Sequence, residues 1–271
     1  MADSRAIGIF DSGLGGLTVA KRVMELMPDE NIVYFGDTGR VPYGTKSVET
    51  ITKYALEDER FLLSKNVKMI VAACGTVSSV AADTGKDLPV PFVEVISHSV
   101  EAAVAASKTK RIGVLATPAT IKSHAHREKI RALCPGAAVV ETAAPLLVSL
   151  AEEGWYQTDN EIARLTVKEY LRDMAAGGVD TLILGCTHFP VFSDLIREFM
   201  PETGLIDMGA AAARYIKKTL AERDAANLPA NKAEHLFFVS DKPVTFRKTV
   251  KIFLGDCSND IKIDQVDVEQ I

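Results

Sequence analysis

Two stretches of the sequence decide the fold: MIVAACGT at residues 69–76 and TLILGCTH at residues 181–188. Each is a short apolar run followed by a cysteine, with a threonine close behind it. Short apolar runs of this kind predict strands that are buried on both faces, as in parallel sheets. Each half of the chain therefore has a thiol at the end of an expected buried strand.

Similar apolar runs alternate with amphipathic stretches along the whole chain. We predict strands over residues 6–10, 32–35, 69–73, 90–96, 111–116, 138–141, 181–184 and 236–239, and helices that include residues 49–65 and 161–176. Such alternation is typical of α/β folds in which helices cover parallel sheets. Ligands in these folds bind beyond the carboxyl ends of the strands, so both cysteine-bearing segments lie where a site is expected.

The composition restricts the class of protein. The chain has 271 residues, of which 47% are hydrophobic and 25% charged, as in one large or two small globular domains. A net charge of −5 argues against a nucleic-acid partner, and the lack of a long uninterrupted apolar run argues against a membrane partner. No signal-peptide pattern is visible, so we expect a cytoplasmic protein that acts on a small molecule.

The cysteines offer the first candidate chemistry. They are Cys74, Cys134, Cys186 and Cys257. They form no C-x-x-C pair or zinc-ligand spacing, so we expect no metal site and no disulfide framework. Cys74 and Cys186 stand at expected helix starts, where unpaired N–H groups favour the thiolate and lower a cysteine pKa towards neutral. Thr76, Thr187 and His188 are near enough to orient or exchange a proton, although simple packing beneath the strand ends is the alternative.

The turn GIFDSGLGGL at residues 8–17 ends the first predicted strand. It lacks the third glycine of a dinucleotide-binding fingerprint, and Asp11 would repel a phosphate. A phosphoryl-accepting aspartate is disfavoured too, because Gly13 stands where a second acid is usual. An amino-acid site remains: Asp11 and Ser12 suit an ammonium group, and glycine N–H groups can approach a carboxylate.

Three further segments have both a structural and a functional interpretation. In GDTGRVPYG at residues 36–44, Arg40 pairs with Asp37, or Tyr43 and the N–H of Gly44 close over an anionic substrate. The stretch TPAT at residues 117–120 is either an ordinary helix cap or part of the site. In AEEGW at residues 151–155, solvated surface acids are the default interpretation.

The chain closely resembles the glutamate racemase family of the aspartate/glutamate racemase superfamily. The resemblance rests on GIFDSGLGG at residues 8–16, GDT at 36–38 with PYG at 42–44, and LGCTHFP at 184–190. It covers nearly the whole chain in the family's order. It implies two similar α/β domains with mainly parallel sheets and the active site at their interface. The first domain is expected over residues 1–97 and 209–271, and the second over residues 98–208.

The same resemblance implies the residue roles. Cys74 and Cys186 match the paired bases of a racemisation that needs no pyridoxal phosphate or other cofactor. Asp11, Glu152 and His188 match the catalytic groups that assist them. The expected substrate contacts are Asp11, Ser12, Pro42, Tyr43, Gly44, Gly75, Thr76, Thr117, Thr120, Thr187 and His188. The implied reaction interconverts L- and D-glutamate and supplies D-glutamate for peptidoglycan, and a homodimer is implied as an assembly.

Two single positions and the segment at residues 93–98 depart from the family pattern. Gly75 replaces an asparagine whose amide contacts the substrate, and Met208 replaces a common serine. Losing a hydrogen bond to a charged group costs about 1.5–3 kcal/mol. Two alternatives therefore stay open: a racemase of aspartate or another amino acid, in a pocket that Gly75 enlarges, and a catalytically impaired amino-acid-binding homologue.

Overall fold

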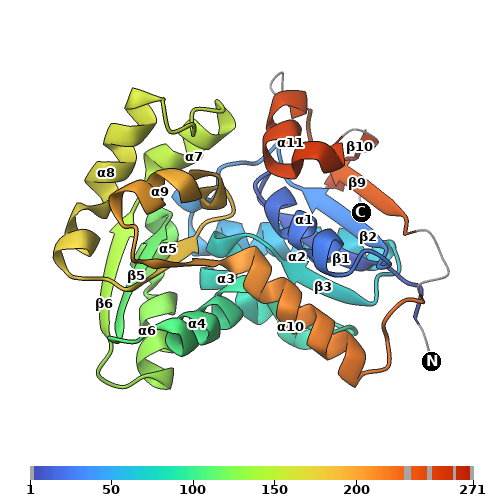
Figure 1. Cartoon of the computed structure of the whole chain (residues 1–271). Helices are drawn as coiled ribbons and strands as arrows, with labels where there is room; N and C mark the ends of the chain where they lie inside the picture. Colours follow the sequence, from blue (N-terminus) through green and yellow to red (C-terminus); the bar gives the residue numbers. More distant parts are fainter. Residues whose placement is uncertain (1–2, 229–232, 243–245, 259–260, 269–271) are drawn as a thin grey trace.

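The strands of the protein form two sheets in which all paired strands are parallel (Figure 1). The computed structural model describes residues 3–228, 233–242, 246–258 and 261–268. The first sheet contains β1 (Ile7–Asp11), β2 (Ile32–Gly36), β3 (Met69–Ala72), β4 (Phe92–Glu94), β9 (His235–Val239) and β10 (Ile263–Gln265), in the order β10-β9-β2-β1-β3-β4. The second contains β5 (Arg111–Ala116), β6 (Ala138–Ala143), β7 (Thr181–Gly185) and β8 (Gly204–Asp207), in the order β6-β5-β7-β8. The prediction of two α/β domains with parallel sheets is confirmed.

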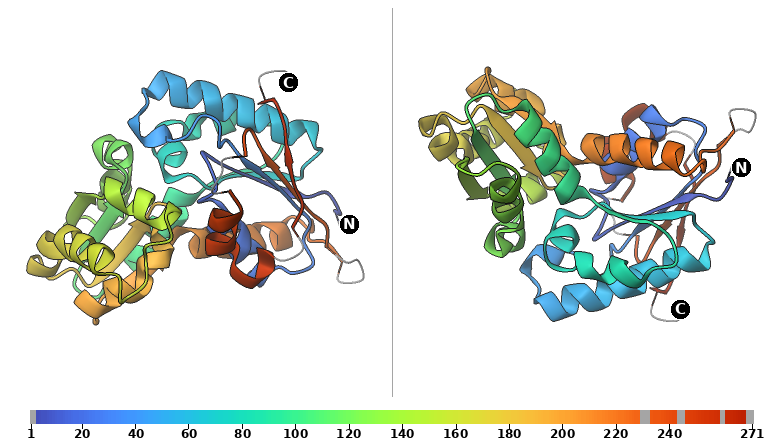
Figure 2. Two further views of the ribbon diagram at one scale, coloured as in Figure 1. Left: turned by 90° about the horizontal axis from the view of Figure 1, so that it is seen from above. Right: turned by 90° about the horizontal axis from the view of Figure 1, so that it is seen from below.

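Helices cover both faces of each sheet. The α-helices are α1 (Leu17–Leu26), α2 (Val48–Ser64), α3 (Gly75–Val80), α4 (Val95–Ala106), α5 (Pro118–Ser123), α6 (Ala125–Leu133), α7 (Pro145–Glu152), α8 (Glu161–Ala176), α9 (Ser193–Phe199), α10 (Met208–Glu222) and α11 (Phe246–Leu254). Short 3₁₀ helices are η1 (Tyr43–Thr45), η2 (Ala82–Asp87), η3 (Phe189–Phe192) and η4 (Gly255–Ser258). Helix α2 lies on one face of the first sheet, and α1, α10 and α11 lie on the other (Figure 2).

The central strands are apolar because they are covered on both faces. Every residue of β1 and of β7 is buried, and Ile7, Ile9 and Phe10 are completely inaccessible to solvent. A strand with helices above and below it cannot alternate polar and apolar side chains, because neither face meets water. The fully buried apolar runs of β1 and β7 therefore lie in the middle of the two sheets.

The chain crosses between the two sheets twice. It leaves the first sheet at β4 and enters α4, which packs against β7 and β8 of the second sheet. It returns from β8 into α10, which packs against α1 and α4 (Figure 1). The strands of the first sheet thus come from both ends of the chain, while those of the second lie between. Domain boundaries at residues 97 and 208 stay a prediction.

The predicted strand over residues 90–96 is too long. Only Phe92–Glu94 is a strand, and α4 begins at Val95 because the Glu94 carboxylate accepts hydrogen bonds from the N–H groups of Ile96 and Ser97, at 2.6 and 3.0 Å. The edge strands β8 and β10 were not predicted. Both are short and have partly exposed, polar residues, so they lack the apolar signature of the central strands.

A buried ion pair ties the first sheet to the chain segments beside it. The Lys68 ammonium lies 2.6 Å from the Glu30 carboxylate, with 1% and 5% of the two side chains exposed. The same ammonium donates hydrogen bonds to the carbonyl groups of Asp3 and Ala225, at 2.7 and 2.9 Å. These contacts attach both the start of the chain and the segment after α10 to the sheet.

We expect Lys68→Met to lower the free energy of unfolding by about 3–5 kcal/mol, because it leaves the Glu30 carboxylate buried without its cation. Urea denaturation measures the change. The matched control is Lys86→Met, since Lys86 forms a 2.7 Å pair with Asp83 in which both side chains are largely exposed. Equal losses of stability in the two variants would contradict the expected importance of the buried pair.

Candidate active site

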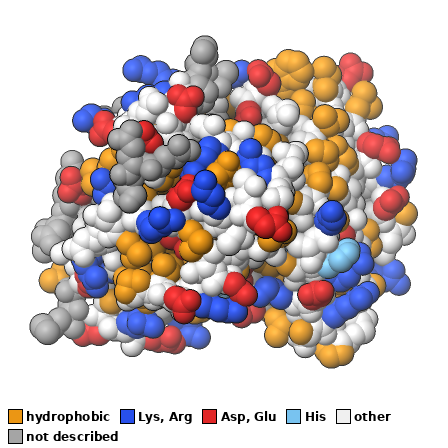
Figure 3. Space-filling model, turned by 180° about the vertical axis from the view of Figure 1, so that it is seen from behind, with side chains coloured by type: hydrophobic (Ala, Val, Ile, Leu, Met, Phe, Trp, Pro, Cys, Tyr) orange, Lys and Arg blue, Asp and Glu red, His pale blue; other side chains and the backbone are white. Residues whose placement is uncertain are grey.

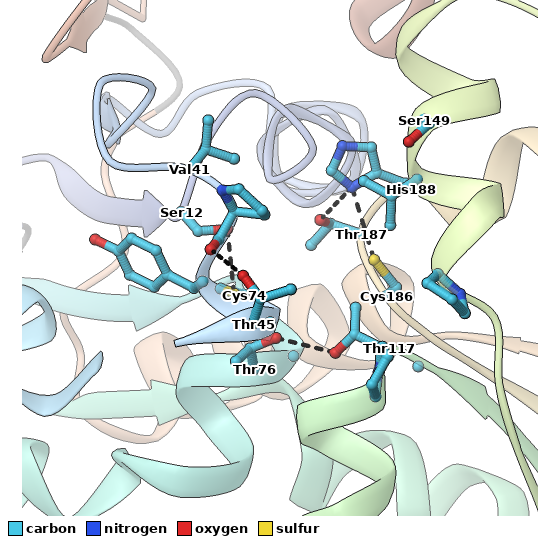
Figure 4. A pocket seen from close by; sticks show the side chains of 18 residues that line it. Ser12, Val41, Thr45, Cys74, Thr76, Thr117, Ser149, Cys186, Thr187 and His188 are labelled. Atoms are coloured by element: carbon cyan, nitrogen blue, oxygen red, sulfur yellow. Dashed lines mark hydrogen bonds between the residues drawn. The ribbon is translucent and has the colours of Figure 1, made fainter. Parts of the chain in front are cut away.

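A cavity of about 270 Å³ lies between the two domains, at the carboxyl ends of their strands (Figure 4). Its walls follow strands of both sheets and consist of Ser12, Val41, Pro42, Tyr43, Gly44, Thr45, Cys74, Gly75, Thr76, Thr117, Pro118, Pro145, Val148, Ser149, Gly185, Cys186, Thr187 and His188. Because both sheets direct their carboxyl ends to this place, one cavity collects side chains from both domains. Its size suits a small molecule.

Most of the predicted site residues lie in this wall. Those that line the cavity are Ser12, Pro42, Tyr43, Gly44, Cys74, Gly75, Thr76, Thr117, Cys186, Thr187 and His188. Asp11, Thr120 and Glu152 are not part of the described lining. Thr120 contacts the lining residue Thr117, Glu152 contacts the lining residue His188, and Asp11 directly precedes Ser12. Sequence patterns thus located the cavity but did not separate the residues in its surface from those behind it.

Cys74 follows β3 and precedes the first turn of α3, as predicted. Its thiol lies 3.5 Å from the hydroxyl oxygen of Ser12. The predicted fall of its pKa towards neutral is wrong: burial, together with the negative charge of Asp11, raises the pKa of Cys74 to about 12. The short helix α3 does not offset the loss of hydration, so Cys74 carries its proton at neutral pH.

Asp11 lies behind the wall of the cavity. Its side chain is fully buried, and its carboxylate accepts a hydrogen bond from the N–H of Gly13 at 3.0 Å. Gly16 permits this packing, because a Cβ atom there would overlap the Cβ of Asp11. Burial raises the pKa of Asp11, and the neighbouring His188 opposes that rise. The carboxylate therefore acts electrostatically on both Cys74 and His188.

Cys186, His188 and Glu152 form a linear chain of polar contacts. The Cys186 Sγ lies 3.6 Å from His188 Nδ1, and His188 Nε2 lies 3.2 Å from a carboxylate oxygen of Glu152 (the first contact is drawn in Figure 4). Burial alone would lower the pKa of His188, but hydrogen bonds and charge interactions with Cys186 and Glu152 raise it to about 10. His188 is therefore a cation at neutral pH, and its ring lies next to the Cys186 sulfur.

Threonine hydroxyl groups connect the two domains across the cavity. The hydroxyl oxygens of Thr76 and Thr117 lie 3.1 Å apart (Figure 4). The Thr117 hydroxyl oxygen also lies 3.0 Å from that of Thr120. On the opposite side, the Thr18 hydroxyl donates to the carbonyl of Thr187 at 2.9 Å. Thr117 is the N-cap residue of α5, as one interpretation predicted, but its side chain makes no capping hydrogen bond.

Residues 41–44 of the segment 36–44 line the cavity, and a buried charge cluster holds the segment in place. The Arg40 guanidinium forms ion pairs with Asp37 at 2.6 Å, Asp58 at 3.1 Å and Glu57. The predicted pairing of Arg40 with Asp37 is confirmed. The Tyr43 hydroxyl contacts Asp37 and Asp58, so it serves this cluster while the residue lines the cavity.

The absence of a side chain at Gly75 does not leave additional empty space in the cavity. A Cβ atom there would lie 2.7 Å from the carbonyl oxygen of Gly185 and 3.3 Å from the Cε of Met208. That space is already filled by the other domain and by the start of α10. The expectation of a larger pocket at Gly75 is therefore wrong.

Seven lining residues were not among the predicted site residues: Val41, Thr45, Pro118, Pro145, Val148, Ser149 and Gly185. Pro145, Val148 and Ser149 belong to α7, which follows β6. The rule that ligands bind at the carboxyl ends of strands would have indicated this helix, because β6 is a predicted strand. No local motif distinguishes its three residues.

In the ranges that the structure describes, no group of three or more His, Cys, Asp or Glu side chains is arranged to hold a metal ion. No described helix has the length and apolar character needed to cross a membrane.

The profile of the Asp/Glu/hydantoin racemase family matches residues 18–216. The chain belongs to this family. This racemase is 43% identical over 259 residues to the glutamate racemase of Geobacter metallireducens, and the match covers 95% of each chain. The expected membership and the expected class of enzyme, an amino-acid racemase, are confirmed.

Solved structures are similar over nearly their whole length. The glutamate racemase of Francisella tularensis in complex with D-glutamate matches with a TM-score of 0.90 and 36% identity, over 99% of this chain and 100% of that one. The Escherichia coli glutamate racemase in complex with L-glutamate matches with a TM-score of 0.79 and 26% identity, over 97% and 98% of the two chains. The arrangement of the two domains is thus that of solved glutamate racemases.

We expect Glu152→Gln to lower the pKa of His188 by about one unit, because it removes the half-exposed carboxylate that favours the imidazolium. NMR titration of the His188 ring measures this pKa. The matched control is Glu153→Gln, since Glu153 pairs with Lys248 at 3.6 Å. A His188 pKa that is the same in both variants would contradict the assignment.

The contribution of the protonated His188 ring to the free energy of unfolding depends on pH. Because its pKa is raised in the folded state, the contribution is fully present below the ordinary histidine pKa of about 6.5 and is lost as the pH rises through about 10. In Glu152→Gln this loss is expected at lower pH.

Proposed function

We propose that this racemase interconverts L- and D-glutamate by a cofactor-independent, two-base mechanism. The observation that carries the proposal is that Cys74 and Cys186, one from each domain, line the same cavity. Relatives such as that of Geobacter metallireducens bear the name glutamate racemase. Similar solved structures hold D-glutamate or L-glutamate, which supports glutamate as the substrate here.

The unequal surroundings of the two thiols support different roles for them in the resting enzyme. Cys74 has a pKa of about 12 and is the proton donor at neutral pH. Cys186 lies beside the cationic His188 and is the proposed base. Glu152 is a positioning residue that holds the imidazolium, while burial and the nearby Asp11 together keep Cys74 protonated.

The reaction then proceeds in two proton transfers. The Cys186 thiolate takes the α-proton, so that the Cα–H bond breaks, an S–H bond forms, and the electron pair is delocalised into the substrate carboxylate. Cys74 donates its proton to the opposite face of Cα, which inverts the configuration. Turnover leaves Cys186 protonated and Cys74 as a thiolate, the state that performs the reverse reaction. Proton exchange restores the resting state, because a buried thiolate next to Asp11 is unfavourable.

The cavity wall has groups that can assist removal of the weakly acidic α-proton of glutamate. Negative charge that develops on the substrate carboxylate needs hydrogen-bond donors and the exclusion of water. The hydroxyl groups of Ser12, Thr76, Thr117 and Thr187 lie in the wall and are the proposed donors to the charged groups of glutamate. The remaining proposed contacts are Pro42, Tyr43, Gly44, Gly75 and His188, while Thr120 acts through Thr117.

The biological setting belongs to the same proposal. D-glutamate is a component of peptidoglycan in bacteria, and we propose a cytoplasmic enzyme that supplies it. A homodimer is the proposed assembly by analogy with the family.

The test is incubation of the enzyme with L-glutamate in D₂O. We expect deuterium at Cα together with loss of optical rotation. Cys74→Ala and Cys186→Ala are each expected to reduce racemisation by about 10²- to 10⁴-fold, because each removes one proton-transfer group. The matched control is Cys134→Ala, which removes a half-buried thiol outside the cavity lining.

The outcomes separate the alternatives. Racemisation of aspartate or another amino acid in a substrate panel, without turnover of glutamate, would favour a different substrate. Calorimetric binding of glutamate without isotope exchange at Cα would favour an impaired binding protein. Full activity in either cavity-cysteine variant would exclude the two-base mechanism.

A further inference from the structure

The two segments that carry the cavity cysteines touch through their glycines. Gly75 follows Cys74 at the start of α3, and Gly185 precedes Cys186 at the end of β7. The position that a Cβ atom on Gly75 would take lies only 2.7 Å from the carbonyl oxygen of Gly185. Real Cβ atoms essentially never approach another heavy atom so closely, so any side chain at residue 75 requires movement of the structure.

The obstacle at this contact is backbone and not a flexible side chain. Gly185 pairs with Ala116 in the second sheet, and a Cβ on Gly185 itself would lie 2.9 Å from the Leu115 carbonyl oxygen. The Gly185 carbonyl therefore cannot turn aside without disturbing the pairing of β5 and β7. The response that remains is separation of the two cysteine-bearing segments.

Met208 packs over the same contact. It is 2% exposed, and its Cε lies 3.3 Å from the position of the missing Gly75 Cβ. Met208 begins α10, the second crossing between the domains, and the preceding Asp207 accepts a hydrogen bond from Arg22 of α1 at 2.9 Å. The side chain is thus anchored to the first domain while it fills the space beside the contact.

We propose that Gly75 is a positioning residue for racemisation: its contact with Gly185, held closed by Met208, sets the distance between the Cys74 and Cys186 thiols. The inference rests on the proposed function. Each glycine is the sequence neighbour of one cysteine, so a shift at the contact moves the thiols apart. A displacement of about 1 Å costs on the order of 10²-fold in rate when two groups act on one atom.

The test compares Gly75→Ala with the wild-type enzyme in D₂O, starting from each enantiomer of glutamate. We expect inversion to fall by about 10- to 100-fold. Proton abstraction needs only one thiol, so deuterium incorporation with retained configuration is expected to persist, and the ratio of exchange to inversion rises. Gly204→Ala is the matched control, because a Cβ at that exposed residue meets only the Asp180 carbonyl oxygen at 3.7 Å.

Each outcome has a defined meaning. An unchanged ratio and rate in a folded Gly75→Ala variant would overturn the role of the contact. Absence of racemisation and exchange in the wild-type enzyme would instead overturn the proposed function. Should Gly75→Ala not fold, Met208→Ala tests the same contact by removing its packing without adding an atom. The ratio is then expected to rise, and an unchanged ratio would refute the proposal.

Discussion

The site depends on one structural constraint: the carboxyl ends of the strands of both sheets meet at the same place. Parallel sheets direct backbone turns and the residues that follow them to one edge, and here the edges of two sheets enclose a single cavity. The hydrogen bond from Thr18 to the Thr187 carbonyl joins the edges on one side, and the pair of Thr76 and Thr117 joins them on another. Neither sheet alone would surround a small molecule.

The two buried thiols have neighbouring side chains of opposite charge. Near Cys74 the closest charge is that of Asp11, whereas Cys186 faces the imidazolium of His188. The back of the molecule, seen in Figure 3, shows charged side chains of both signs spread among apolar ones. The electrostatic distinction between the thiols corresponds to the side chains beside them, Asp11 for Cys74 and the His188–Glu152 pair for Cys186.

The sequence predicted those strands and helices whose residues form a local pattern of apolar side chains. The apolar runs identified β1, β3 and β7, and the helix predicted over residues 161–176 is observed as α8. Edge strands such as β8 escaped prediction, because their pairing partner and not their composition makes them strands. The raised pKa of Cys74 depends first on its burial and then on the nearby Asp11 carboxylate, and no helix-start pattern encodes either. The roles of α7 residues and of the Gly75 contact likewise depend on segments far apart in the sequence.

The strands of the first sheet come from both ends of the chain, and this order affects how the protein folds during its synthesis. Strand β2 pairs with β9, so one edge of β2 has no partner until the ribosome has made residues 235–239. The second sheet uses only strands between residues 111 and 207, and all its pairings are available earlier. All strands of the second sheet are therefore synthesised before the first sheet can be completed. Until β9 is synthesised, the unpaired edge of β2 is available to pair with other chains.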